Sequence, residues 1–369
     1  MSSLRDGHIG AVEATILVAI YMGSKIFLTF PRDMAKLGAT AAWFIPLFSM
    51  LVALLIFTFF NRLLLRFPGR NLVQVTETLL GPVAAGVATV IYFLIFFFIT
   101  VVILRELAEM VKTIIMPMTP ISVFIGLFLA AALFAAYQGI ESLSRGAWLF
   151  FPFILLAFVL IIIGTAPFMR WENITPVLGY GPLPLLKWGL IKVALFGEGF
   201  ILGLIPPYLR DQKDFSMIGY GSIILSGLTM TLTVFAYLLV FGMPSCIHAG
   251  AYPLYQMARL IFYGRFIQRV DVLFIFIWVF SILFTLAFSL YGGAVVLAQY
   301  FNLETYRPLL FPVSLLTYAA VFLAPSFPVA EWLDNQLLRT YGAVVVMLPL
   351  LLYIVAKGWR LREGGENAA

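Results

Sequence analysis

The chain has 369 residues, of which 63% are apolar and only 11% are charged, and its net charge is +6. The mean hydropathy is +1.04. A soluble domain carries about 25% charged residues, and a single soluble core could not hide this much apolar surface. Composition therefore excludes a cytosolic enzyme, a nucleic-acid-binding module and a disordered tail. It indicates an all-α polytopic membrane protein.

Hydropathy and helix breakers predict about ten spanning helices, each needing about 20 apolar residues. The first is interpreted as a retained helix, because it contains Lys25, is longer than the apolar part of a signal peptide and lacks a small-x-small cleavage site. A short helix is also predicted at 254–262, in the long connection after the seventh span. The predicted spans are 9–30, 40–64, 83–115, 121–137, 146–166, 186–209, 215–241, 270–300, 309–323 and 339–359.

Both termini are predicted to be cytoplasmic. An even number of spans puts the two ends on one side of the membrane, and basic residues concentrate on the cytoplasmic side. Three arginines, Arg62, Arg66 and Arg70, lie at and beyond the end of the second span, and the C-terminal tail is basic as well. These clusters favour cytoplasmic termini.

Cysteine and histidine are too few for a metal or disulfide framework. Cys246 is the single cysteine, so no internal disulfide forms. His8 and His248 are far apart in sequence and have no partner cysteines, so we expect no zinc or haem site. The sequence shows no nucleophile–base pairing, and we expect neither an enzyme nor a cofactor. The absence of a long basic run argues against a nucleic-acid partner.

Two predicted spans are interrupted in the same way, by glycine close to a charged residue. The interruptions are Tyr21–Lys25 in the first span and Phe196–Gly199 in the sixth. Glycine weakens a helix interior, and a charge in mid-membrane costs about 2.5–3.5 kcal/mol on insertion scales. Matching breaks of this kind are typical of inverted-repeat transporters. The sequence therefore predicts one transmembrane domain made of two five-helix repeats, 9–166 and 186–359.

Several local motifs resemble known membrane proteins. The run 23–32 is similar to the first-helix motif of the amino acid–polyamine–organocation superfamily. Other segments resemble the spore-germination permeases, which are the B subunits of spore germinant receptors. Those segments are 105–110 with 116–120, 139–145 with 151–152, 176–181, and 269–271 with Trp278.

The resemblance implies a five-plus-five inverted-repeat fold, surrounded by lipid in the spore inner membrane. It implies A and C subunits as partners. It also implies that the protein binds a nutrient germinant, often an amino acid, and relays this binding to its partners to trigger germination. Two alternatives are a proton-coupled amino acid transporter and a structural scaffold whose pocket is vestigial.

The candidate ligand site lies at the two breaks, between the first and sixth spans. Broken helices expose backbone groups and partial charges that suit a zwitterionic amino acid, with its carboxylate at Gly23 and Ser24 and its ammonium near 196–198. The alternative for the glycines is close helix packing, and the residues from the third and eighth spans could serve packing alone. The predicted ligand-binding residues are Met22, Gly23, Ser24, Lys25, Phe96, Thr100, Phe196, Gly197, Glu198, Gly199, Ser281 and Thr285.

Lys25 departs from the small residue that related first-helix motifs place there. It could mimic a bound cation, pair with a ligand carboxylate, or form an ion pair with Glu198. We prefer the ion pair, because an unpaired charge in the membrane is expensive; the alternative is that Lys25 extends toward an interface. Glu198 is the candidate proton-linked switch, and its alternative role is a structural pair with Lys25 or Lys192.

Overall fold

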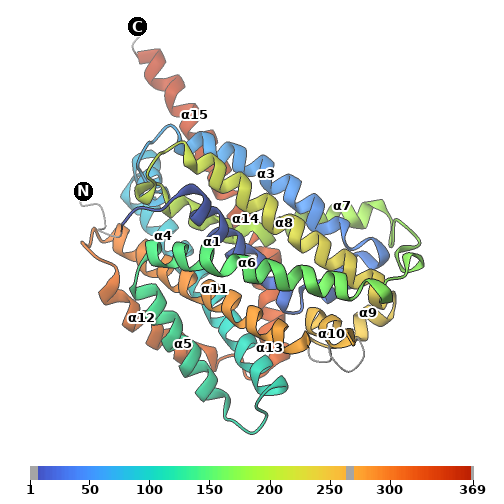
Figure 1. Cartoon of the computed structure of the whole chain (residues 1–369). Helices are drawn as coiled ribbons and strands as arrows, with labels where there is room; N and C mark the ends of the chain where they lie inside the picture. Colours follow the sequence, from blue (N-terminus) through green and yellow to red (C-terminus); the bar gives the residue numbers. More distant parts are fainter. Residues whose placement is uncertain (1–6, 263–269, 367–369) are drawn as a thin grey trace.

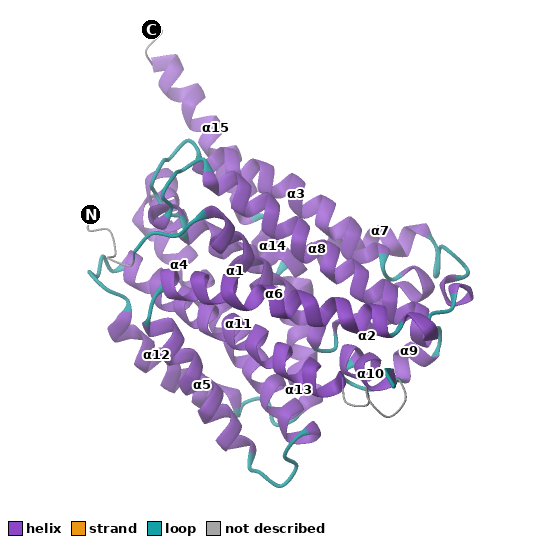
Figure 2. Ribbon diagram, in the orientation of Figure 1, coloured by secondary structure: helices purple, strands orange, loops and turns teal. Residues whose placement is uncertain are grey.

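The computed structural model describes residues 7–262 and 270–366, so Arg269 of the last motif lies outside the described residues. Within these ranges the chain is helical, joined by short loops and turns, and contains no strand (Figure 2). An isolated bridge joins Ile9 to Leu209.

The helical elements fall into three groups. The α-helices are α1 (Ala11–Gly23), α2 (Phe30–Gly38), α3 (Phe44–Leu64), α4 (Leu72–Ile114), α5 (Ile121–Tyr137), α6 (Ile140–Gly164), α7 (Pro182–Ile191), α8 (Asp214–Phe241), α9 (Ser245–His248), α10 (Pro253–Leu260), α11 (Val270–Tyr300), α12 (Arg307–Val321), α13 (Phe327–Trp332), α14 (Ala343–Val346) and α15 (Leu348–Glu366). The 3₁₀ helices are η1 (Ser24–Phe27), η2 (Ala39–Ala41), η3 (Ala166–Phe168), η4 (Trp171–Ile174), η5 (Lys192–Leu204) and η6 (Pro206–Tyr208). The π-helix is η7 (Leu333–Tyr341).

Among the described residues, five helices are long and apolar enough to cross a membrane, namely α3, α4, α6, α8 and α11. A sixth span would consist of α1 and α2, which are bent by 69° at their break. Shorter apolar helices are α5, α12 and the first part of α15. Each of the ten predicted segments overlaps one of these elements or the α7–η5 run.

The long helices form the centre of the bundle. In Figure 1, α4 and α11 run beside each other, and α1 packs along α8, as the contacts between these elements require. The start of α1 and the projecting α15 lie at one end of the bundle, whereas α2, α9, α10 and α13 gather at the opposite end (Figure 1). The two ends therefore present different elements to the two sides of the membrane.

Two helix boundaries differ from the prediction at glycine. The third span begins at Leu72 rather than at 83, because Gly81, with φ of +85°, produces a kink and not an end. An Asn71 cap starts this helix, with the Gln74 N–H donating to Asn71 Oδ1 at 2.9 Å. The fifth span begins at Ile140, directly after Gly139, whose φ is +90°.

The last predicted span differs most. We expected one helix over 339–359, but the chain forms the π-helix η7, then the short α14, and then α15. Asp334 and Arg339 in η7 are both buried. Buried opposite charges hold this segment inside the bundle, so Arg339 is not the start of a spanning helix.

Both predicted interruptions are present. After α1 ends at Gly23, the 3₁₀ turn η1 carries the chain to the bend before α2. In the sixth span, α7 gives way to η5, a 3₁₀ helix of 13 residues. Such runs rarely exceed three or four residues, and a longer one often marks a hinge or strain.

Candidate functional site

The two broken spans meet at a cluster of buried charges. Lys25 Nζ lies 3.1 Å from Glu198 Oε2 and donates a hydrogen bond to the Leu195 carbonyl. Arg339 approaches Glu198 from η7, with its Nη1 2.8 Å from Glu198 Oε1, and its Nε lies 3.0 Å from Asp334. The side chains of Lys25, Glu198 and Arg339 are only 3%, 5% and 4% exposed. We call Lys25, Glu198, Arg339 and Asp334 the ion cluster.

The ion cluster balances two cations with two anions. Taking a charge out of water costs several kcal/mol, and only close pairing and hydrogen bonds repay this cost. The preferred ion pair of Lys25 with Glu198 is therefore present, and the ammonium does not extend to an interface. Lys192 does not pair with Glu198; its ammonium donates to Thr340 Oγ1 at 3.2 Å.

Arg339 is the functional candidate that the sequence reasoning missed. It was placed at the end of a span, where arginine is ordinary. The available signal was the Asp334–Arg339 pair, five residues apart and flanked by leucines. Only the winding of η7 brings Asp334 against Arg339 and directs Arg339 to Glu198.

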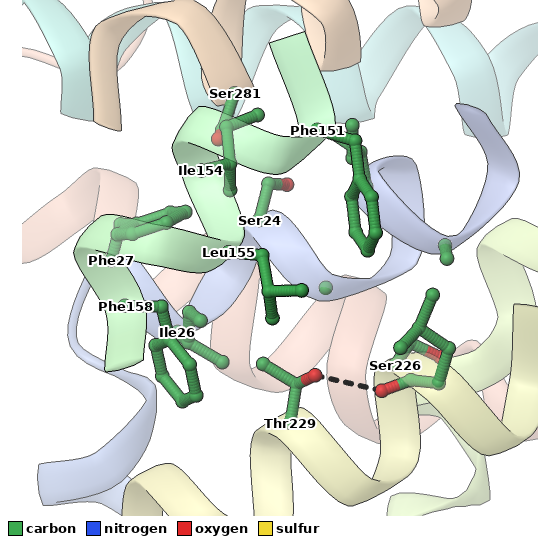
Figure 3. Close-up of a pocket in the computed structure, with 14 residues that line it drawn as sticks. Ser24, Ile26, Phe27, Phe151, Ile154, Leu155, Phe158, Ser226, Thr229 and Ser281 are labelled. Carbon is green, nitrogen blue, oxygen red and sulfur yellow. Dashed lines mark hydrogen bonds between the residues drawn. The ribbon is translucent and has the colours of Figure 1, made fainter. Parts of the chain in front are cut away.

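A cavity lies beside the first break (Figure 3), between α1, η1, α6, α8 and α11. It offers about 60 Å³ to the centres of water-sized molecules. Gly23 and Ser24 line it from the break, and Ser226 and Ser281 line it from α8 and α11. Ser281 Oγ is buried and has no hydrogen-bond partner among the described residues. We call this space the break cavity.

The lining of the break cavity is mostly aliphatic and aromatic. Figure 3 shows Phe27, Phe151 and Phe158 around it. The Ser24 N–H is already bonded to the Ile20 carbonyl. The Ser24 N–H is therefore not free for a ligand carboxylate, because it makes the last i→i−4 hydrogen bond of α1.

The other predicted ligand-binding residues lie around these two features. Phe196 and Gly199 line a second cavity, of about 40 Å³ on the same measure, which faces α3 and α14. An added Cβ at Gly199 would lie 3.4 Å from Met22 Sδ, and one at Gly197 would lie 3.3 Å from Val346. Met22 therefore connects the first break to Gly199, whereas Gly197 faces α14.

The hydroxyl groups of the third and eighth spans that were predicted to contact a ligand donate mainly to backbone carbonyls of the bundle. Thr100 Oγ1 donates to the Phe96 carbonyl at 2.8 Å, and Thr285 Oγ1 donates to the Ser281 carbonyl at 3.0 Å. Ser289 Oγ also donates to the Phe96 carbonyl, at 2.9 Å. The Phe96 carbonyl therefore joins α4 to α11, whereas Thr100 bonds within α4. Of this group, Ser281 lines the break cavity.

A helical bundle with two broken spans is the fold of inverted-repeat transporters. The solved structure of Mhp1, a nucleobase-cation-symport-1 family transporter, superposes with a TM-score of 0.68 and covers 95% of this chain and 79% of that one, at 13% identity. At 13% identity, this similarity shows that the two proteins share a fold. The model of the family described as "Spore germination protein" matches residues 8–327, and the chain belongs to this family.

Curated relatives carry the same description. Spore germination protein KB of Bacillus subtilis (strain 168) is 26% identical over 376 residues, covering 99% of this chain and 100% of the relative. Spore germination protein GerLB of Bacillus cereus is 24% identical over 384 residues, covering 98% of each. The chain is therefore an integral membrane protein of the spore germination family with a permease-like fold.

Proposed function

We propose that the chain is the germinant-sensing membrane subunit of a spore germinant receptor. It binds a small amino acid at the broken spans, in the spore inner membrane with both termini cytoplasmic, and relays binding to A and C subunits. Family membership supports the germination role. One observation carries the sensing role: Gly23 and Ser24 line the break cavity, and the next residue, Lys25, holds Glu198 of the other broken span.

The break cavity suits a small aliphatic group. A water molecule needs about 10–15 Å³ on this measure, so the break cavity holds a few waters or the side chain of a small amino acid. Ser281 Oγ supplies an unused polar contact. A ligand seated here shifts η1, and η1 carries Lys25 and thus pulls on the ion cluster. Sensing is then a shift between two arrangements of the broken spans.

Filling the break cavity tests this proposal. Ala19 is 4% exposed and lines the cavity from α1, and Ala19→Leu places three more carbons there without breaking the helix. The matched control is Ala130→Leu on the exposed face of α5. We expect Ala19→Leu to weaken the germination response of spores at least about tenfold, equivalent to ~1.4 kcal/mol. A response equal to that of the control overturns the proposed site.

Uptake separates sensing from transport. Proteoliposomes with this chain alone are given labelled L-alanine or L-valine, with and without an imposed pH gradient. Saturable binding without accumulation supports the sensor. Accumulation driven by the gradient identifies a working proton-coupled transporter instead, and the sensing proposal then fails.

A further inference from the structure

A large cavity with several charged side chains in its lining lies at the end of the bundle opposite α15. It offers about 360 Å³ on the same measure and is lined by α2, α7, η5, α13 and η7. Its charged lining consists of Asp33, Lys36, Lys192 and Glu331, and two indole rings, Trp188 and Trp332, also line it. We call this cavity the vestibule.

Lys192 is the unusual member of the vestibule. Its residue is only 3% exposed, and its ammonium has one hydrogen bond, to the neutral hydroxyl of Thr340. An ammonium has three donors. Among the described residues, no carboxylate lies within 4 Å of it, in contrast to Lys25 and Lys36, which pair with Glu198 and Asp33. A buried cation without an anion is costly, so Lys192 favours an anionic occupant.

The acids of the vestibule are already engaged. Asp33 Oδ1 lies 3.0 Å from Lys36 Nζ, and Asp33 Oδ2 accepts from Asn335 Nδ2 at 2.8 Å. Glu331 pairs with Arg32 and lies 3.8 Å from Lys36. These acids act on Lys192 only from a distance. They line the same cavity, and they disfavour an occupant that carries negative charge alone.

We propose that the vestibule binds a small zwitterionic amino acid, with its carboxylate on Lys192 and its ammonium toward Glu331 and Asp33. The site is separate from the break cavity. The indole rings of Trp188 and Trp332 provide walls for an apolar side chain. One carboxylate supplies the missing counter-charge of Lys192, and a charge-assisted hydrogen bond of this kind is about twice as strong as a neutral one.

The vestibule is one hydrogen bond from the ion cluster. Thr340, the partner of Lys192, follows Arg339 directly in the chain and donates to the Asn335 carbonyl at 2.8 Å. A carboxylate that draws Lys192 away from Thr340 therefore acts on η7, which holds Glu198 through Arg339. This relay rests on the proposed function, whereas binding in the vestibule does not.

Saturation-transfer NMR on the full chain in detergent tests binding with three probes of one skeleton. L-valine carries both charges, 3-methylbutanoate carries the carboxylate alone, and 2-methylpropan-1-amine carries the ammonium alone. We expect the strongest saturation for L-valine, a weaker one for 3-methylbutanoate and the weakest for the amine. Equal saturation for the amine and for 3-methylbutanoate overturns the assignment of Lys192.

Variants of Lys192 test whether L-valine binds in the vestibule. All are made in the Ala19→Leu background, in which the break cavity is filled. Lys192→Met removes the ammonium and keeps the length, and we expect at least about a tenfold loss of L-valine affinity. Lys192→Arg retains a cation and the preference for the carboxylate, and Lys357→Met, an exposed lysine at the other end, leaves binding unchanged. Undiminished binding by Lys192→Met overturns the proposal.

Protection against heat gives a second readout. Lys192→Met removes an uncompensated buried charge, so the variant folds and its Tm rises. In the Ala19→Leu background, in which the break cavity is filled, L-valine then raises the Tm of the chain with Lys192 and not that of the chain with Lys192→Met. Ala19→Leu fills the break cavity only and keeps vestibule binding. The germination response of this variant therefore tests the break cavity, and its L-valine binding tests the vestibule, so that failure of one proposal is distinguishable from failure of the other.

Discussion

At the ion cluster each charge is held by a partner from a distant part of the chain. Lys25 comes from the first broken span, Glu198 from the second, and Arg339 from the π-helix near the end of the described chain. Glu198 occupies the centre, with one oxygen facing each cation. Its removal leaves Lys25 without a carboxylate, and Arg339 keeps Asp334.

Glu198→Gln is expected to lower the free energy of unfolding by about 3–5 kcal/mol, because it leaves the buried Lys25 ammonium unpaired. Chemical denaturation in detergent measures this loss. The double variant Lys25→Met with Glu198→Gln removes both charges and regains most of the stability. Spores with either variant lose the germination response, because the two breaks are no longer joined. A single variant as stable as the wild type would show that the pair is energetically idle.

At the scale of the helix, glycines in different spans have different roles. An added Cβ at Gly219 in α8 would lie 1.8 Å from Phe57 Cζ in α3, so this glycine permits close packing. An added Cβ at Gly23 would meet only Ser226 Cβ, at 3.9 Å. Gly23 is therefore not required for close helix packing. Its position in the lining of the break cavity explains a glycine here better than packing does.

A pair of alanine substitutions checks this difference. Gly23→Ala raises the stability by up to about 1 kcal/mol, since alanine favours a helix more than glycine does. Its methyl group enters the break cavity and weakens the germination response. Gly219→Ala costs about 1–3 kcal/mol through overpacking against Phe57. Thermal unfolding in detergent measures both, and equal losses of stability contradict the separate roles.

The long spans and both breaks could be predicted from the sequence, because apolar runs and Gly-charge interruptions are local signals. The Lys25–Glu198 pair also followed, since a mid-membrane charge needs a partner. The role of Arg339 and the presence of the vestibule could not be predicted from the sequence. Both depend on how η7 winds and on how α2, α7 and α13 meet at one end of the bundle, and no local pattern encodes that association.

At the scale of the whole molecule, the two ends of the bundle carry different chemistry. One end has α15 (Figure 1), in which Lys357 is exposed. The other end has the vestibule and η4, in which Glu172 is exposed. With cytoplasmic termini, the vestibule faces the opposite side. A germinant then meets the vestibule before it reaches the break cavity.

Maleimide labelling checks this orientation. Burial raises the pKa of the Cys246 thiol to about 11, so at neutral pH this cysteine carries almost no thiolate and stays unlabelled. We expect Glu172→Cys to react with an impermeant maleimide added outside intact cells. Lys357→Cys reacts only after permeabilisation. The reverse pattern places the termini outside.

The ion cluster has equal numbers of positive and negative charges. A translation of its four members as one unit carries no net charge through the membrane, whereas a single elementary charge that crosses the membrane is worth about 2.3 kcal/mol per 100 mV. Such a translation is therefore neither driven nor opposed by the membrane potential. A germination response that uses this translation alone has the same size in an energised and in a fully depolarised membrane.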